Sequence, residues 1–87
     1  MNVTTKYIIG FDSMDREKYL KIIGSRIQKY RILKGLSQEE LTRRCGYKSK
    51  SSISKIESGV YDIPISKILV IAQSLNINEI DILRREG

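Results

Sequence analysis

The residues with the clearest chemical potential are positively charged and gathered in one segment. Residues 26–55 carry nine Lys or Arg side chains against two acids, a net charge of +7, whereas the rest of the chain sums to −1. A basic segment of this kind is typical of a surface that binds a polyanion such as nucleic acid. The alternative is a solvated surface that only keeps the protein in solution. The basic residues are Arg26, Lys29, Arg31, Lys34, Arg43, Arg44, Lys48, Lys50 and Lys55.

Catalytic chemistry has few suitable groups in this sequence. The 87 residues include no histidine for acid–base catalysis, and they contain neither a glycine-rich phosphate loop nor a carboxylate cluster. The single cysteine, Cys45, has no base near it in sequence and fits a small buried side chain better than a nucleophile. With no histidine and a single cysteine, the sequence also lacks the usual nitrogen and sulfur ligands for zinc. We therefore expect no enzyme activity, no metal and no cofactor.

The same counts bear on the cellular compartment. One cysteine cannot form an internal disulfide, which suits a reducing environment. The longest apolar run, residues 68–72, is far too short to span a bilayer, and the N-terminus lacks the pattern of a signal peptide. We expect a cytoplasmic protein without membrane contact and, at this length, a single domain.

The spacing of apolar residues predicts helices around and within the basic segment. A first helix is expected from about residue 13 to Gly35, which suits its C-terminal end. Ser37 and Glu40 form a capping box that starts a second, short helix ending near Cys45. The first helix would bury a stripe made of Leu20, Ile23, Ile27, Tyr30 and Leu33.

Three further helices are expected in the second half of the chain. Gly46 breaks the second helix, and a third runs from near Lys50 to Gly59. Pro64 suits the first turn of a fourth helix, and Asn78 suits the cap of a last short one. The apolar face of the fourth helix would contain Ile65, Ile68, Leu69, Ala72 and Leu75.

Residues 1–12 differ from the rest and predict an N-terminal arm rather than a helix, because β-branched and aromatic residues dominate them. Such an arm would be costly to leave in water, so it packs either on its own domain or on a partner. Met14 offers an alternative start that would remove the arm. The apolar residues of the arm include Tyr7, Ile8, Ile9 and Phe11.

Two short helices joined by a glycine-containing turn, at about residues 37–59, make a helix-turn-helix on the basic segment. The chain resembles the phage repressor and Cro (XRE) family of such domains over about residues 20–83. The resemblance implies an all-α, compact five-helix lambda-repressor-like DNA-binding domain over residues 13–87, preceded by the arm. It rests on the runs IGSRI (23–27), GLSQEEL (35–41), SISKIESG (52–59) and IAQSL (71–75), with Arg31 and Gly46 between them.

The sequence departs from that family at two places. Thr42 stands where the family usually has alanine, at the contact between the two motif helices, so we expect slightly looser packing there. Six residues rather than five separate Gly46 from Ile53, which predicts a turn one residue longer and leaves the first residue of the recognition helix open.

The resemblance also implies roles for individual side chains. A recognition helix reads base edges in the major groove, while the helix before it contacts the DNA backbone. For the lysines the alternative is phosphate contact alone, and for the other charged residues it is a solvated surface charge. The residues expected to contact bases are Lys50, Ser51, Ser54 and Lys55. Those expected to contact phosphates are Gln38, Arg43, Arg44, Lys48 and Ser52.

A further implication of the resemblance concerns Arg31 and Glu57. In the family, residues at these positions form an ion pair that ties the first helix to the end of the third. The pair would hold the recognition helix in place, and losing one partner of a partly buried pair is costly. The alternative is two unrelated surface charges.

Together these features predict a sequence-specific transcription regulator that acts as a repressor on double-stranded DNA. We expect a homodimer on an inverted-repeat, pseudo-palindromic operator, with a regulatory protein partner as one means of control. The alternative class is a helical protein-interaction module, such as an antitoxin or antirepressor partner. Prophage repressor, restriction-modification controller and self-repressing antitoxin stay open as settings. Dimer contacts are expected on the arm, or on residues that could also complete the monomer core, namely Ile77, Ile80, Ile82 and Leu83.

Overall fold

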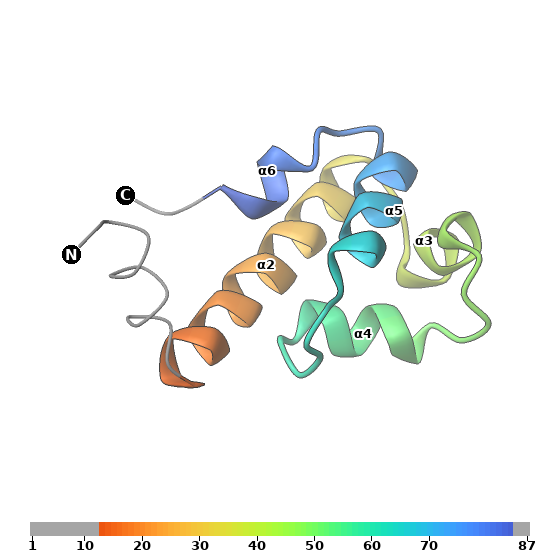
Figure 1. Ribbon diagram of the computed structural model, residues 1–87. Coiled ribbons are helices and arrows are strands. Elements are labelled where there is room, and N and C mark those ends of the chain that lie inside the picture. The colour runs from red at the N-terminus through yellow and green to blue at the C-terminus, as the bar shows by residue number, and fades with distance from the viewer. Residues whose placement is uncertain (1–12, 85–87) are drawn as a thin grey trace.

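The computed structural model describes residues 13–84, with side chains from residue 16 onward. The predicted arm, residues 1–12, lies outside this range. No strand occurs among the described residues, so the predicted all-α fold of five helices is confirmed. The helices are α2 (Ser13–Leu33), α3 (Gln38–Cys45), α4 (Ser51–Glu57), α5 (Ile65–Leu75) and α6 (Ile80–Leu83) (Figure 1).

The long helix α2 organises the packing. It contacts α4, α5 and α6, while α3 packs against both α4 and α5. In Figure 1, α4 runs below α2 and α6 lies above it, and α3 sits at the opposite end of the molecule from the start of α2. None of the helices described is long and apolar enough to cross a membrane.

The boundaries of α3 follow from the predicted capping residues. The Ser37 hydroxyl accepts a hydrogen bond from the Glu40 amide at 3.0 Å, and the Ser37 amide donates to Glu40 Oε1 at 3.0 Å. Gly46 ends the helix with a φ of 77°, a left-handed conformation that favours glycine. The turn then occupies residues 46–50. Helix α4 therefore begins at Ser51, with Lys50 at the N-cap.

The last two helices begin and end close to the predicted places. Pro64 occupies the N-cap of α5 rather than its first turn. Asn76 ends α5 in the left-handed region with a φ of 56°, a role that the sequence analysis did not assign. Glu79, not the predicted Asn78, occupies the N-cap of α6, and the Asn78 side chain accepts a hydrogen bond from the Ile80 amide at 2.9 Å one residue before it.

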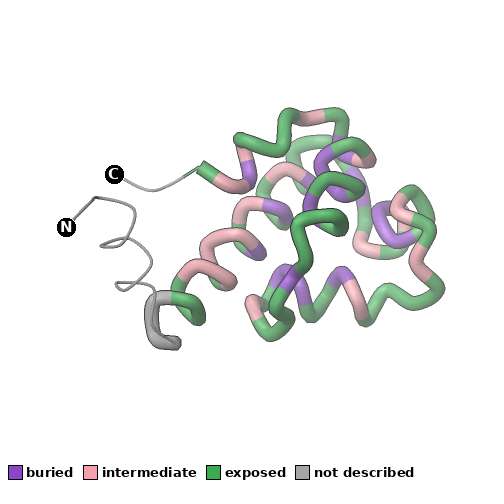
Figure 2. Tube along the Cα trace, in the orientation of Figure 1, coloured by how far each residue is buried: buried purple, intermediate pink, exposed green. Residues whose placement is uncertain are grey.

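The core is built mainly from isoleucine and leucine, and the buried positions face inward from every helix (Figure 2). Leu33, Ile65 and Leu69 were predicted to be buried but are exposed. Arg31, one turn after Ile27, takes the buried position that was assigned to Leu33, and the other two lie at the edge of the buried face of α5. The buried apolar residues are Ile27, Leu36, Leu41, Ile53, Ile56, Ile63, Ile68, Ile71, Ala72, Leu75 and Ile82.

Two helices approach closely at Gly24, where α2 meets the end of α4. A Cβ atom added to Gly24 would lie 2.2 Å from the Ile56 carbonyl oxygen and 2.6 Å from that of Glu57. Only glycine therefore fits this position without a backbone shift. The contact fixes how far α4 stands from α2.

Candidate nucleic-acid interface

Helix α4 has a buried face and an exposed polar face. Ile53, Ile56 and Glu57 are buried, whereas Ser51, Ser54 and Lys55 are exposed. Residues three and four apart in a helix share a face, so the three exposed side chains point the same way. Lys50, at the N-cap, is exposed beside them. The four residues predicted to contact bases thus lie together on one surface.

A buried ion pair holds the other side of α4. Arg31 Nε donates to Glu57 Oε2 at 2.6 Å and Arg31 Nη2 to Glu57 Oε1 at 3.1 Å, with exposed side-chain fractions of 11% and 2%. The third nitrogen, Arg31 Nη1, donates to the Leu36 carbonyl oxygen at 2.8 Å. The pair therefore joins α2 both to α4 and to the loop before α3.

Gln38 adds a third helix to this network. Its Nε2 donates to Glu57 Oε1 at 3.0 Å, so the first residue of α3 is tied to the last residue of α4. The Gln38 side chain is half-buried, and this bond fixes its orientation. One N–H of its amide group is not used by the bond to Glu57 and remains the group with which Gln38 could bind a phosphate. The sequence analysis had assigned Gln38 to phosphate alone.

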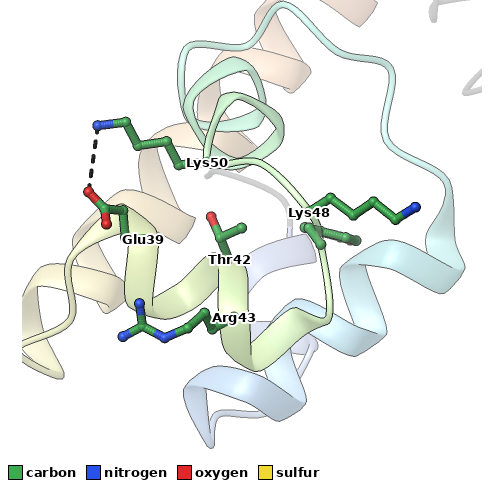
Figure 3. A pocket seen from close by; sticks show the side chains of 6 residues that line it. Glu39, Thr42, Arg43, Lys48 and Lys50 are labelled. Atoms are coloured by element: carbon green, nitrogen blue, oxygen red, sulfur yellow. Dashed lines mark ion pairs between the residues drawn. The ribbon is translucent and has the colours of Figure 1, made fainter.

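Two of the remaining phosphate candidates line an open pocket of about 310 Å³ between α3 and the loop before α4. Arg43 and Lys48 line it and are exposed, and Figure 3 shows their side chains extending in different directions. Arg44 is exposed on the last turn of α3, and Ser52 is half-buried on α4. The full lining consists of Glu39, Thr42, Arg43, Tyr47, Lys48 and Lys50.

One acidic residue lies within this basic surface. Glu39 Oε1 is 3.8 Å from Lys50 Nζ, and the two side chains are 67% and 61% exposed. Figure 3 shows Lys50 turned toward Glu39 across the pocket. The other acid of the segment, Glu40, belongs to the capping box. The contact of Glu39 with Lys50, one of the residues expected to contact bases, was not predicted from the sequence.

A second contact that the sequence analysis missed involves Lys55. Its Nζ lies 5.5 Å from the centre of the Tyr61 ring, a cation–π distance. Tyr61 belongs to the loop after α4 and is 36% exposed. No periodic pattern links a loop residue to a helix residue, so the spacing could not have predicted this contact.

Thr42 fills the place where the family usually has alanine. It is buried, and its hydroxyl donates to the Gln38 carbonyl oxygen at 2.6 Å. The extra polar group is therefore satisfied inside α3.

Two neutral side chains border the same region. Burial raises the pKa of the Cys45 thiol, which donates to the Ser74 hydroxyl at 3.4 Å. Burial also raises the pKa of Tyr47, whose ring lies 5.3 Å from Lys67 Nζ. The thiol environment favours the protonated form, whereas a nucleophilic cysteine needs the thiolate. Both residues pack against the core.

The structure separates the four residues that were expected at a dimer contact. Ile82 is fully buried in the core of its own chain, so the prediction that it contacts a second subunit was wrong. Ile77 and Leu83 are half-buried against the core. Ile80 is 58% exposed. In a helix of four residues only one side can face the core, and Ile82 is on it.

Comparisons with known proteins match the same part of the chain. The helix-turn-helix family model HTH_3 covers residues 27–82. Curated proteins give no significant match.

Four chains of solved structures match this chain significantly, among them the following two. The restriction-modification controller protein C.AhdI from Aeromonas hydrophila has 31% sequence identity and a TM-score of 0.70, covering 74% of this chain and 96% of that one. The hypothetical transcription factor NHTF from Neisseria has 29% identity and a TM-score of 0.71, covering 77% of each chain. The chain belongs to the helix-turn-helix family HTH_3, the XRE-type family of DNA-binding transcription regulators.

Proposed function

We propose that the protein is a sequence-specific repressor that reads its operator with α4. The observation that carries this proposal is the division of α4 into two faces. Its buried face is held by the Arg31–Glu57 pair, while its exposed face offers hydrogen-bonding side chains. Lysine donates to guanine O6 and N7, and serine donates to or accepts from several bases. The proposed base contacts are Lys50, Ser51, Ser54 and Lys55.

Phosphate contacts would position α4 in the groove. Arg43, Arg44 and Lys48 are exposed on α3 and on the loop that follows it. The free N–H of Gln38 lies at the start of α3, where helix amides and the helix dipole favour an anion. Ser52 is half-buried on the side of α4 and completes the proposed set. Contacts of this kind fix the register of a protein on DNA but carry no sequence information.

A homodimer on an inverted repeat is the second part of the proposal. Two subunits related by a twofold axis would place their α4 helices one helical turn apart, about 34 Å, in successive major grooves. Leu69 and Val70 on α5 and Ile80 on α6 are large apolar residues exposed on the described part of the chain. Exposed apolar surface supports an association surface. Repression needs only that the bound dimer blocks access to the promoter.

The similarity to C.AhdI favours one of the three settings. That protein is a restriction-modification controller, and the aligned region covers 96% of it. We propose the same setting here, in which the protein controls the genes of a methyltransferase and its endonuclease. Such genes next to the coding sequence would support the setting, while a toxin gene or a lysis–lysogeny region would contradict it.

The first experiment is selection of bound sequences from random duplex DNA, followed by titration of the enriched site at several salt concentrations. A palindromic consensus, bound more tightly than scrambled DNA at physiological salt, is the expected result. Salt-dependent binding without a consensus would leave a protein that binds only the DNA backbone. Absence of DNA binding would favour the interaction module and redirect the search to a protein partner.

A pair of double variants tests the role of α4. Replacing Lys50 and Lys55 with alanine should lower operator affinity by about 1–3 kcal/mol for each lysine that reads a base, and should weaken the preference over scrambled DNA. The matched control replaces Lys18 and Arg84, which are exposed and outside the basic segment, and so removes the same charge. Equal loss of affinity in both variants, with the preference intact, would contradict base reading by α4.

Sedimentation equilibrium tests the dimer. Leu69→Glu and Ile80→Glu should each weaken self-association, whereas Ile32→Glu, at a position 60% exposed on α2, should not. A protein that stays monomeric on its selected DNA would contradict the homodimer.

A further inference from the structure

An apolar groove of about 350 Å³ is lined by no residue of α3 or α4. It lies between the first half of α2, the loop before α5, the start of α5 and the end of α6. Ile65, at the first position of α5, is 62% exposed along the groove. The floor contains Ile63 and Ile68, which are buried. The remaining lining residues are Arg16, Tyr19, Leu20, Ile23, Asp62 and Leu83.

The chemistry of the lining favours an apolar chain segment over a polar ligand. Small-molecule sites combine an apolar cavity with a few polar groups that converge on the ligand. Here the charged residues, Arg16 and Asp62, form an ion pair with each other. This pair joins the first turns of α2 to the loop before α5. The rest of the lining is aliphatic apart from Tyr19, and such a surface gains most from covering with other apolar side chains.

The chain itself supplies a segment of that kind next to the groove. Residues 1–12 lie outside the described part and lead directly into α2, whose first turns line the groove. This segment contains the run Tyr7-Ile8-Ile9 and only one basic residue, Lys6, so it is unsuited to contact DNA phosphates. We propose that residues 1–12 pack Tyr7, Ile8 and Ile9 into this groove of their own chain.

The lengths are compatible with a segment that folds back along α2. Ile23 lies about 15 Å along α2 from Ser13, at a helical rise of roughly 1.5 Å per residue. Ile8 is five residues before Ser13, and an extended chain of that length spans up to about 17 Å. Gly10 lies between the apolar run and the helix and permits the reversal of direction that this path requires. The apolar run can therefore lie beside Leu20 and Ile23.

Attachment to the same chain favours this occupant over a second copy. A short tether gives an effective concentration in the millimolar range, which an untethered partner does not reach at cellular levels. The sequence left open whether the arm packs on its own domain or on a partner. The position of the groove beside the first turns of α2 favours its own domain.

A double-mutant cycle on the full chain tests the contact without DNA, so its result does not depend on the proposed function. One variant carries Ile8→Asp and Ile9→Asp, a second carries Ile65→Asp, and a third carries all three changes. Because Ile65 is exposed when the groove is empty, Ile65→Asp lowers the unfolding temperature only if something covers it. We expect the first two variants each to lose about 4–8 °C or more, and the triple variant to lose less than the sum.

Ile32→Asp is the matched control, because Ile32 is 60% exposed at the other end of α2. Equal small losses for Ile65→Asp and Ile32→Asp, or fully additive losses in the cycle, would overturn the proposal. Concentration separates the two possible occupants. A contact within one chain gives the same temperature losses at every protein concentration, whereas losses that grow with concentration would assign the groove to a second copy.

Discussion

Two acid–base pairs flank α4, and they differ in almost every physical respect. Arg31 and Glu57 meet at 2.6 Å with side chains 11% and 2% exposed. Lys50 and Glu39 approach only to 3.8 Å, with side chains 61% and 67% exposed. Buried ions must be paired because water cannot solvate them, whereas exposed pairs are worth little and exchange partners readily.

The difference in burial indicates that the two pairs have different roles around α4. The buried pair, with Gln38 and the Leu36 carbonyl, connects three helices and gives α4 one orientation. The exposed pair leaves Lys50 able to leave Glu39 for a base or a phosphate. Residues that position the helix are thus separated by burial from the residues that are proposed to read DNA.

Removing one partner of the buried pair should have the largest effect. Glu57→Ala leaves the Arg31 guanidinium buried without a counter-charge, which costs about 3–5 kcal/mol in free energy of unfolding. A loss of that size approaches the total stability of a small domain. Urea unfolding followed by circular dichroism measures it.

The double variant Arg31→Met with Glu57→Leu is the control for this prediction. It removes both charges and keeps similar volume, so it should recover most of the stability lost by Glu57→Ala. A single variant as stable as the wild type would show that the pair does not hold α4.

A substitution at Gly24, which contacts the backbone at the end of α4, should give the second largest effect on stability. Alanine usually stabilises a helix relative to glycine by about 1 kcal/mol. In Gly24→Ala the new methyl group would meet the carbonyl oxygens of Ile56 and Glu57, which belong to the backbone and cannot rotate away. We expect a net loss of about 1–3 kcal/mol. Ser25→Ala, at the exposed neighbouring position, should change stability little, and an equal result for both would contradict the close approach.

Much of the fold could be predicted because its signals are local. Ser37 with Glu40, Gly46 and Asn78 each act on backbone groups within a few residues, so the helix boundaries followed from the sequence. The Arg31–Glu57 contact was expected only through the family resemblance, since 26 residues separate the partners.

Other features depend on tertiary packing and left no local signal. Ile80 and Ile82 are both apolar and lie in a helix of four residues. So short a helix shows no apolar periodicity, and the sequence therefore could not show that Ile80 is exposed and Ile82 is buried. Glycine suits many contexts, so Gly24 gave no sign of the α2–α4 contact. Lys55 and Tyr61 meet through the course of a loop, and Lys50 meets Glu39 across the gap between two helices.

The capping box gives a smaller effect with a defined dependence on pH. Ser37→Ala should cost about 1 kcal/mol at neutral pH, because the amides at the start of α3 lose their acceptor. The Ser37 backbone N–H, and then its hydroxyl, lower the pKa of Glu40. A carboxylate with a lowered pKa stabilises the folded state above its ordinary pKa, and this contribution is lost as pH falls through the lowered value.

The loss caused by Ser37→Ala should therefore shrink as the pH is lowered through the carboxyl range. Unfolding midpoints of wild type and variant at a series of pH values measure this. A difference that stays constant down to the acid limit would mean that the hydroxyl does not act on the Glu40 carboxylate.

The smallest expected effect belongs to the exposed pair and concerns binding rather than folding. Glu39→Gln should change the free energy of unfolding by less than about 0.5 kcal/mol, because both partners are in water. It removes a negative charge beside the proposed phosphate contacts and frees Lys50, so affinity for duplex DNA should rise by up to about fivefold at low salt. The salt dependence should steepen by up to about one unit. Glu17→Gln, on the first half of α2, is the charge-matched control and should change neither. Lower affinity in Glu39→Gln would contradict this prediction. It would mean that the Glu39 carboxylate itself contacts the DNA, for example by accepting a hydrogen bond from a cytosine amino group, so that both residues of the exposed pair would read sequence.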